Sequence, residues 1–263
     1  IDLSNWQLDQ NPEASLDGEW TFYPNQFVSA SDSIYPDGGV VAVLPSFFGA
    51  KKSGLSERQG YGTYVTQISL PPEVTNRSLV LSLTPSDTAG RYVVTDLAGQ
   101  PLSPVVEQGK VGVELDASLP QRVPSEVPLR YGLPETILVW VQVSNFHQEI
   151  GGIWGAPKLV EATYAFRSAK VQSMIDGLLV GLMVLFGIYH MVIYLQGRRD
   201  PILLSFSLLC FLVGVRTAVM ARYPELFIST WTVDDYSLWL KVEFLTLPLC
   251  VLAFGYYFKA FSL

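Results

Sequence analysis

The chain has 263 residues, of which 49% are hydrophobic and 16% charged, and it carries a formal net charge of −7. This charged share lies well below the ~25% typical of soluble domains, and the shortage falls on residues 169–263, which hold 7 Lys/Arg and 6 Asp/Glu against 10 and 18 in residues 1–168. The acidic first part argues against nucleic acid as a partner, because phosphate binding requires clustered Lys and Arg.

Residues 1–163 predict a mainly β domain. Runs of strand length, rich in β-branched and aromatic residues and bounded by Pro, Gly, Asn or Asp, are TYVTQISL (63–70), SLVLSLT (78–84), RYVVTDL (91–97) and ILVWVQV (137–143). No long helical period separates them, so we expect an antiparallel sandwich, either a jelly roll or immunoglobulin-like. Four large aromatic residues are expected in its core: Trp6, Trp20, Phe22 and Trp140.

The segment SNFHQEIGGIWG (144–155), which follows the last long strand, combines polar and aromatic side chains with a glycine pair. Loops of a sandwich are frequent binding sites, and glycine lets backbone approach closely. Two residues of neighbouring strands are expected to join this loop. The predicted ligand-binding residues are Tyr61, Arg91, Asn145, His147, Glu149 and Trp154. The alternative is that the loop's aromatic residues, Phe146 and Trp154, simply close the end of the sandwich.

Catalytic and metal-binding patterns are missing from the sequence. The chain has only two histidines, and its close acidic pairs, Asp17/Glu19 and Asp234/Asp235, lie in a predicted turn and a predicted loop. A glycosidase needs two carboxylates held across a cleft, and a metal site needs ligand spacings that this chain lacks. We therefore predict no catalytic residue, no metal site and no cofactor.

The second part predicts membrane-spanning helices. Gly177–Leu195 is a run of 19 uncharged residues, close to the ~20 that a bilayer crossing requires. Two more apolar segments follow, 201–220 and 242–258, whose single charged residues are Arg216 and Glu243. The expected organisation is a sensor domain at 1–163, a juxtamembrane linker at 164–172, and a membrane domain at 173–263 whose helices span about 174–195, 202–222 and 238–260.

The loops between these helices predict an orientation. The short loop Gly197–Asp200 contains two arginines, whereas residues 223–240 contain three acids and no Lys or Arg. The positive-inside rule therefore places Gly197–Asp200 in the cytoplasm and residues 1–168 outside. Trp231, Tyr236 and Trp239 would then form an aromatic belt at the outer interface.

Charged residues within apolar helices are costly and usually paired. Arg216 lies in the second predicted helix, ~20 Å from its inner end at ~1.5 Å per residue, and Asp176 and Glu243 lie at a similar depth in the other two. We expect Arg216 to pair with Glu243 or Asp176; the alternatives are a purely structural pair or snorkelling of Arg216. Gly177 and Gly181 have the spacing of a close helix contact, which would also permit a homodimer.

The order of several short motifs resembles a known family. LDGEWTFYP (16–24), VLPSFF (43–48), GYGTYVTQISLP (60–71) and ILVWVQVSNFHQEIGGIWGAPKLV (137–160) occur in this order. They are similar to the galactose-binding-like jelly roll at the front of family 2 glycosidases, although TDLAGQ (95–100) replaces a typical turn. Together with YHMVIYLQGRRDP (189–201), the pattern resembles bacterial seven-transmembrane receptors with diverse intracellular signalling modules.

The resemblance implies a sensor in a bacterial inner membrane with a periplasmic jelly roll. The ligand that the resemblance favours is a small molecule of the carbohydrate class, whereas the residues also fit a peptide, a lipid or a domain of a partner protein. Four further helices and a cyclase, diguanylate cyclase or histidine kinase module would follow, so we expect a chain truncated after its third helix. The alternatives are a membrane-anchored fragment of a carbohydrate-active enzyme and a non-catalytic scaffold that binds a partner protein.

Overall fold

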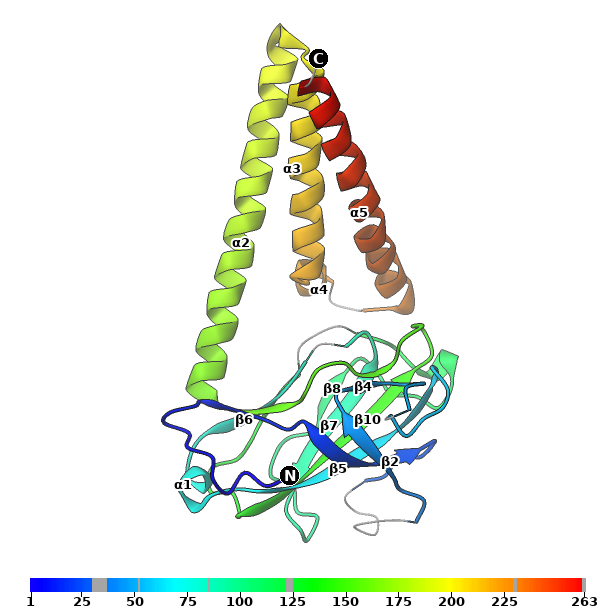
Figure 1. Cartoon of the computed structure of the whole chain (residues 1–263), viewed down its shortest axis with the longest axis vertical. Helices are drawn as coiled ribbons and strands as arrows, with labels where there is room; N and C mark the ends of the chain where they lie inside the picture. The colour runs from blue at the N-terminus through cyan, green and yellow to red at the C-terminus, as the bar shows by residue number, and fades with distance from the viewer. Residues whose placement is uncertain (30–36, 52, 85, 122–124, 229–230, 262–263) are drawn as a thin grey trace. The chain divides into compact units, whose positions relative to one another are not determined.

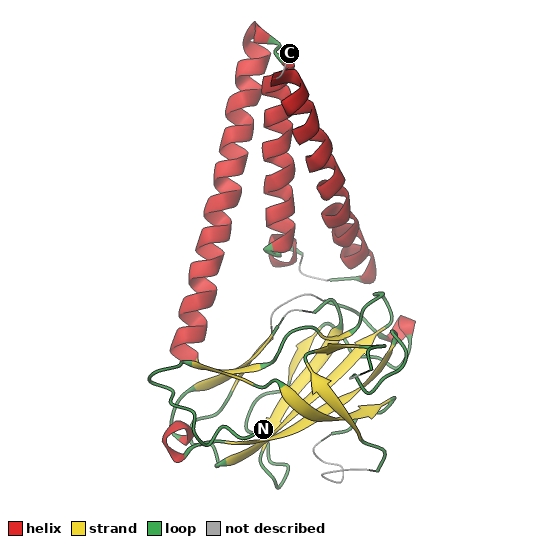
Figure 2. Ribbon diagram, in the orientation of Figure 1, coloured by secondary structure: helices red, strands yellow, loops and turns green. Residues whose placement is uncertain are grey.

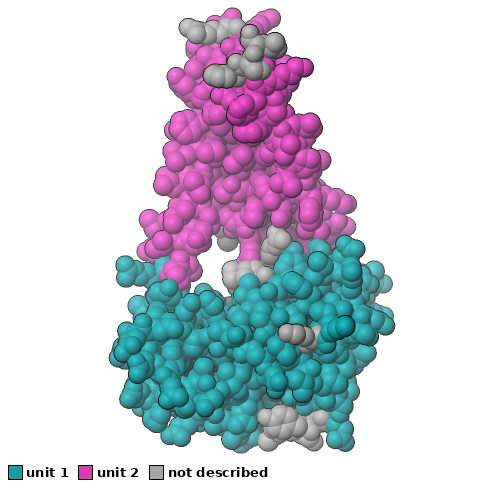
Figure 3. Space-filling view, viewed as in Figure 1, with its two compact units in different colours: residues 1–167 teal, residues 168–263 magenta. Residues whose placement is uncertain are grey.

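The computed structural model describes residues 1–29, 37–51, 53–84, 86–121, 125–228 and 231–261. The chain divides into two compact units, residues 1–167 and residues 168–263 (Figure 3). Strands make up most of the regular structure of the first unit, and long helices make up the second (Figure 2).

Within the described residues, the first unit contains three antiparallel sheets (Figure 1). The largest has six strands in the order β3 (Val40–Leu44), β2 (Gly18–Pro24), β5 (Gly60–Ser69), β10 (Thr136–Asn145), β7 (Ala89–Thr95) and β8 (Val106–Gln108). The second has four strands in the order β1 (Glu13–Ser15), β12 (Lys158–Glu161), β6 (Leu79–Leu83) and β9 (Ser125–Pro128). The third pairs β11 (Gly152–Ile153) with β4 (Ser46–Phe47). Two short helices, α1 (Pro72–Thr75) and a 3-10 turn (Leu115–Ala117), lie between strands.

The two larger sheets share one hydrophobic core. Leu81 and Leu159 of the four-stranded sheet belong to the same buried cluster as Tyr64 and Val141 of the six-stranded sheet. The predicted antiparallel sandwich followed by helices is therefore confirmed. The four aromatic residues expected in the core, Trp6, Trp20, Phe22 and Trp140, are all buried as well.

Strand β10 is buried on both of its faces, which explains its nearly unbroken apolar sequence. Val139 and Val141 face the core between the sheets, whereas Leu138 and Trp140 join a second cluster on the other face of the sheet. The indole N–H of Trp140 donates to the Thr95 hydroxyl at 3.0 Å, so its one polar group is satisfied although buried.

Strand β12 passes into α2 (Ala162–Ile193) without an intervening loop. The Glu161 N–H donates to the Pro12 carbonyl and the Ala162 N–H to the Ser78 carbonyl, both at 2.9 Å. The Glu161 carboxylate then accepts from the Tyr164 N–H at 3.3 Å, which satisfies a free donor of the first helical turn. As a result, residues 164–172, expected as a juxtamembrane linker, are helical.

Among the described residues, three helices are long and apolar enough to cross a membrane, as the sequence predicts. They are α2, which ends in a π-helical turn (Tyr194–Arg198), α3 (Pro201–Met220) and α5 (Val233–Phe261); the short α4 (Tyr223–Phe227) precedes α5. Asp200 caps α3 by accepting from the Ile202 N–H at 2.9 Å. At ~1.5 Å per residue α2 is ~48 Å long, which exceeds the ~30 Å hydrocarbon core of a bilayer.

A close crossing joins α2 to α3. The fully buried Ser207 hydroxyl donates to the Gly187 carbonyl at 2.8 Å. A Cβ at Gly187 would meet the Phe211 ring at 2.9 Å, so only glycine fits this crossing without displacement. The His190 ring packs edge-on against Phe206, with 4.5 Å between the ring centroids.

The shared core predicts a matched pair of substitutions. Leu81→Ala, at a fully buried side chain, should lower the free energy of unfolding of the sandwich by ~2–5 kcal/mol because it leaves a cavity. Leu97→Ala, at a side chain 47% exposed, should change it by less than ~0.5 kcal/mol. Urea unfolding of residues 1–167 measures both values, and equal losses would contradict the sandwich core.

The helix crossing predicts a second pair. Gly187→Leu should force α2 away from α3 and destabilise the helical unit by ~1–3 kcal/mol. Gly181→Leu, on the same helix but with no atom within 4 Å of an added Cβ, should be tolerated. Thermal unfolding of the detergent-solubilised chain compares the two variants. A melting temperature lowered equally by both would show that Gly187 is not at a packed crossing.

Candidate ligand-binding surface and membrane charges

Asn145, at the end of β10, holds the loop that follows it. Its side chain is only 2% exposed. The amide donates to the Arg58 carbonyl at 3.1 Å and to the Gln148 carbonyl at 3.0 Å, and its oxygen accepts from the Gln148 N–H at 3.2 Å. Because these bonds occupy the polar atoms of its side chain, Asn145 holds the loop in position, and neighbouring residues are the candidates for ligand contact.

The glycine pair of the loop has a local structural cause. A Cβ at Gly151 would lie 2.5 Å from the Asn145 side chain, so the buried amide requires glycine above it. Gly152 has a φ of +103°, a conformation that L side chains rarely adopt, and it pairs with Phe47 in the small sheet.

Three partly exposed aromatic rings gather beside this loop. Tyr61 of β5 lies with its ring centroid 4.9 Å from that of Phe27 and 6.5 Å from that of Phe146. We call Phe27, Tyr61 and Phe146 the aromatic cluster. The Gln59 amide donates to the Phe146 carbonyl at 3.3 Å, which ties the loop to the start of β5. The cluster therefore offers an apolar surface built from three separate chain segments.

Charged and polar groups lie on the same loop as Phe146 and on the segment just before β5. Glu149 forms an ion pair with Arg58, with 3.7 Å between the charged atoms, and both side chains are largely exposed. His147 is half-buried, and its Nε2 lies 2.9 Å from the Ser118 carbonyl, which joins the loop to the segment after β8. Of these groups, Arg58 and Glu149 have the exposed side chains that a ligand could contact.

Arg91 and Trp154 lie apart from the aromatic cluster. Arg91 is opposite Gln142 in the sheet register and pairs with Glu107 of β8 at 3.6 Å. Trp154 packs its ring against Phe47 in an edge-on contact of 6.2 Å, and its buried indole N–H has no hydrogen-bond partner within the described residues. Four of the six predicted residues thus lie on or beside the loop after β10, whereas Arg91 contacts Glu107 and Trp154 contacts Phe47.

Tyr64 is a buried polar group beneath this region. Its ring lies 4.3 Å from that of Phe22, and no part of the side chain is exposed. Burial raises the pKa of the Tyr64 hydroxyl well above its ordinary value of 10, and the nearby Ser46 hydroxyl lowers it by a smaller amount. The phenol therefore stays neutral at physiological pH.

In the helical unit, Arg216 of α3 reaches Glu243 of α5 through the main chain. Its Nη1 donates to the Glu243 carbonyl oxygen at 2.8 Å, and the Thr246 hydroxyl donates to the same oxygen at 2.8 Å. Asp176 accepts instead from Gln172 of its own helix at 2.9 Å. The Glu243 carbonyl oxygen therefore gives the Arg216 guanidinium a polar partner within the helical unit.

Sequence reasoning missed Phe27 and Arg58. Each lies in an irregular segment, and neither has a local pattern that marks it. What brings them to the loop is the strand register, in which Tyr61 pairs with Ser144 and Gly60 with Asn145. Strand register of this kind is set by the whole fold rather than by local sequence.

Among known proteins, a family model matches most of the helical unit. Residues 172–263 match the family model described as 7TM diverse intracellular signalling. The model that matches this segment is that of the seven-transmembrane signalling family expected from the sequence, and together with the three membrane-length helices the match fits a membrane sensor receptor. No curated protein matches the chain.

Solved structures with some likeness to the chain are bacterial β-glucuronidases. The enzyme of Ruminococcus gnavus, in complex with uronic deoxynojirimycin, is 16% identical with a TM-score of 0.41, over 57% of this chain and 29% of that one. The enzyme of an uncultured Clostridium sp. is 14% identical with a TM-score of 0.41, over 56% and 28%. The enzyme of Faecalibacterium prausnitzii is 15% identical with a TM-score of 0.38, over 57% and 31%. This chain therefore spans less than a third of each.

The role of Asn145 predicts a stability effect. Asn145→Ala removes three hydrogen bonds and leaves buried backbone groups without partners, so it should lower the free energy of unfolding by ~1–3 kcal/mol. Asn76→Ala, at an exposed asparagine, should change it by less than ~0.5 kcal/mol. Urea unfolding of residues 1–167 tests both, and a neutral Asn145→Ala would reject its role in holding the loop.

Proposed function

We propose that this chain is the sensory part of a bacterial inner-membrane receptor, whose β-sandwich binds a ligand in the periplasm and whose helices pass the change to a cytoplasmic output module. The observation that carries the proposal is the direct passage from β12 into α2, which leads into the matched signalling domain at 172–263. A regular backbone without a flexible loop is suited to transmit a displacement.

The charge distribution supports the proposed orientation. Gly197–Asp200 carries two arginines, and the acids of residues 223–240 have no basic counterpart. The positive-inside rule then assigns Gly197–Asp200 to the cytoplasm and the sandwich to the periplasm.

The aromatic cluster supports a carbohydrate as the ligand. A sugar ring has an apolar face that packs on aromatic side chains, while its hydroxyl groups require hydrogen-bonding partners at the rim. Tyr61 and Phe146 supply the aromatic surface, and Arg58 and Glu149 supply donors and acceptors beside it. Asn145 has a positioning role in this proposal, and His147 joins the loop to the segment after β8.

Ligand binding acts on the helices only through a difference in affinity between two states of the receptor. In our proposal the ligand favours one position of the loop at the end of β10. The change travels through the sandwich to β12, which lies between β1 and β6, and from there into α2. A ligand that bound both states equally would produce no signal.

Binding of sugars to residues 1–167 tests the proposal, because this unit has its own core. A mono- or oligosaccharide at 100 times its Kd should add ~2.7 kcal/mol to the free energy of unfolding. Tyr61→Ala and Phe146→Ala should each weaken binding about tenfold or more, since each removes ring stacking worth ~1.4 kcal/mol. The matched control is Tyr131→Ala, at a tyrosine 71% exposed in another loop.

The outcomes separate the hypotheses. Binding that is lost with Tyr61→Ala and kept with Tyr131→Ala supports a sensor and locates its site. If no mono- or oligosaccharide of the panel binds in calorimetry or shifts thermal unfolding, the carbohydrate proposal is rejected and a domain that binds a partner protein is favoured. Hydrolysis of any panel sugar would instead favour a carbohydrate-active enzyme.

A further inference from the structure

A cleft lies between the N-terminal segment and α1, on the part of the sandwich from which α2 begins. Its volume is about 250 Å³, and residues 7–10 form one wall while Glu73, Val74 and Arg77 form the other. Leu8 and Val74 are buried parts of the sandwich core, so the floor of the cleft is apolar and firmly held. The cleft shares no residue with the aromatic cluster.

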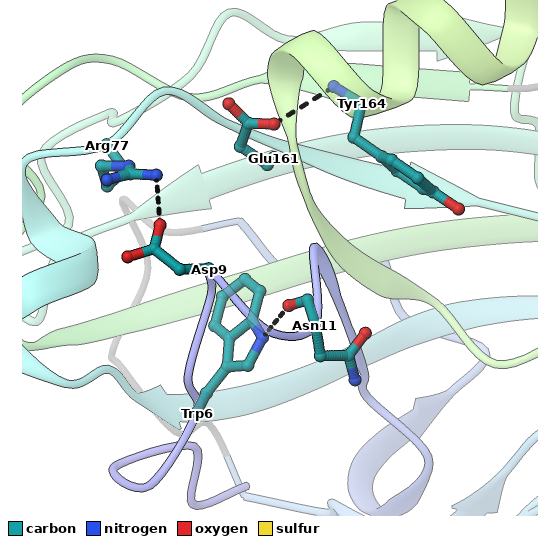
Figure 4. A network of polar contacts seen from close by, with 6 residues as sticks. All are labelled: Trp6, Asp9, Asn11, Arg77, Glu161 and Tyr164. Atoms are coloured by element: carbon teal, nitrogen blue, oxygen red, sulfur yellow. Dashed lines mark hydrogen bonds and ion pairs between the residues drawn. The ribbon is translucent and has the colours of Figure 1, made fainter.

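The rim of the cleft carries both signs of charge. Arg77 donates through Nη2 to the Asp9 carboxylate at 2.8 Å, a contact that Figure 4 shows between the two walls. This bond uses one of the five guanidinium N–H donors, and the structure gives the Arg77 side chain no other partner among the described residues. The side chains of Gln7, Gln10 and Glu73 have no hydrogen bond within those residues either.

These groups set the chemistry of a ligand. Two carboxylates and one guanidinium give the rim a net charge of −1, which disfavours a simple anion. A simple cation would leave the remaining guanidinium donors of Arg77 unused, although they match a carboxylate in a two-bond arrangement. A molecule with an ammonium and a carboxylate satisfies both. The volume lies just below the ~300–1,000 Å³ of sites for larger ligands, so the molecule is small.

We propose that this cleft binds a free amino acid, with its carboxylate on Arg77, its ammonium between Asp9 and Glu73, and its side chain over Leu8 and Val74. This site is separate from the carbohydrate surface proposed above, and does not depend on it. It would give the receptor a second ligand of a different chemical class.

Both walls of the cleft lead directly to the start of α2. Two residues beyond Gln10, the Pro12 carbonyl accepts from the Glu161 N–H, and directly after Arg77, the Ser78 carbonyl accepts from the Ala162 N–H. Figure 4 shows Arg77, Asp9, Glu161 and Tyr164 in one neighbourhood. A ligand that contacts both walls therefore restricts the motion of the Pro12 and Ser78 carbonyl groups, which accept hydrogen bonds from the strand-to-helix junction.

Calorimetry on the 263-residue chain in nanodiscs tests the site. The probes are the twenty L-amino acids, and for each one that binds, the matching amine without the carboxylate and the matching acid without the amine. At least one amino acid should bind, and both analogues should bind about tenfold more weakly or worse. Glucose serves as a neutral polyol. If no amino acid binds, or if glucose binds equally well at this site, the proposal is overturned.

Substitutions locate the site. Arg77→Gln and Asp9→Asn should each weaken amino-acid binding about tenfold or more, and Arg77→Lys should lie between Arg77→Gln and the unchanged chain. The matched control is Lys158→Gln, which breaks another partly exposed ion pair, Lys158 with Glu13 at 2.9 Å, and should leave binding unchanged. Equal losses in all variants would mean that the binding site lies elsewhere. Circular dichroism verifies that each variant folds. We expect Arg77→Gln and Asp9→Asn to fold, because both side chains are exposed.

Hydrogen exchange tests the link to the helix. The bound amino acid should slow exchange of the Glu161, Ala162 and Tyr164 amides, and Arg77→Gln should abolish that slowing. Unchanged exchange in the presence of a bound amino acid would overturn the coupling. Sugar binding at Tyr61 should be the same in Arg77→Gln as in the unchanged chain, so failure of one site is distinguishable from failure of the other.

Discussion

The hydrogen bonds at the end of β12 are the constraint on which the rest of the molecule depends. The Glu161 and Ala162 amides are held by carbonyl groups of two separate segments, Pro12 and Ser78. The first amide closes the pairing of β12 with β1, and the second fixes the first residue of α2. Backbone bonds of this kind are hard to break singly when buried groups would be left without partners. Sandwich and helix are therefore joined by ordinary secondary structure.

The sandwich and the helices obtain their stability in different ways. The sandwich has a core of large side chains from two sheets, among them Tyr64, Leu81 and Val141. The helices have few buried residues and are held where small residues allow close approach, at Gly187 and Ser207, or where a polar group meets a carbonyl, as Arg216 does. In a bilayer, lipid covers the remaining apolar surface, so packing and hydrogen bonds set the helix contacts.

The sequence predicted what depends on local composition. Apolar runs of membrane length identified three helices, and alternating strand patterns with turn residues identified the sandwich and its buried Trp20 and Trp140. No sequence signal indicated that residues 164–172 are helical, because β12 continues into α2 without turn residues between them. The positions of Phe27 and of the buried Asn145 amide depend on strand register, which brings together segments far apart in the chain. The partner of Arg216 is a main-chain carbonyl group, which every residue carries and which no sequence pattern therefore marks.

The length of α2 has a mechanical consequence. An α-helix is a stiff rod at this scale, and ~48 Å of it leaves the strand without a hinge. Ala162–Ile193 contains no proline, which is a usual cause of a sharp kink in a helix. In this respect α2 differs from α5, where Pro248 removes one helical hydrogen bond and is the expected position of a bend.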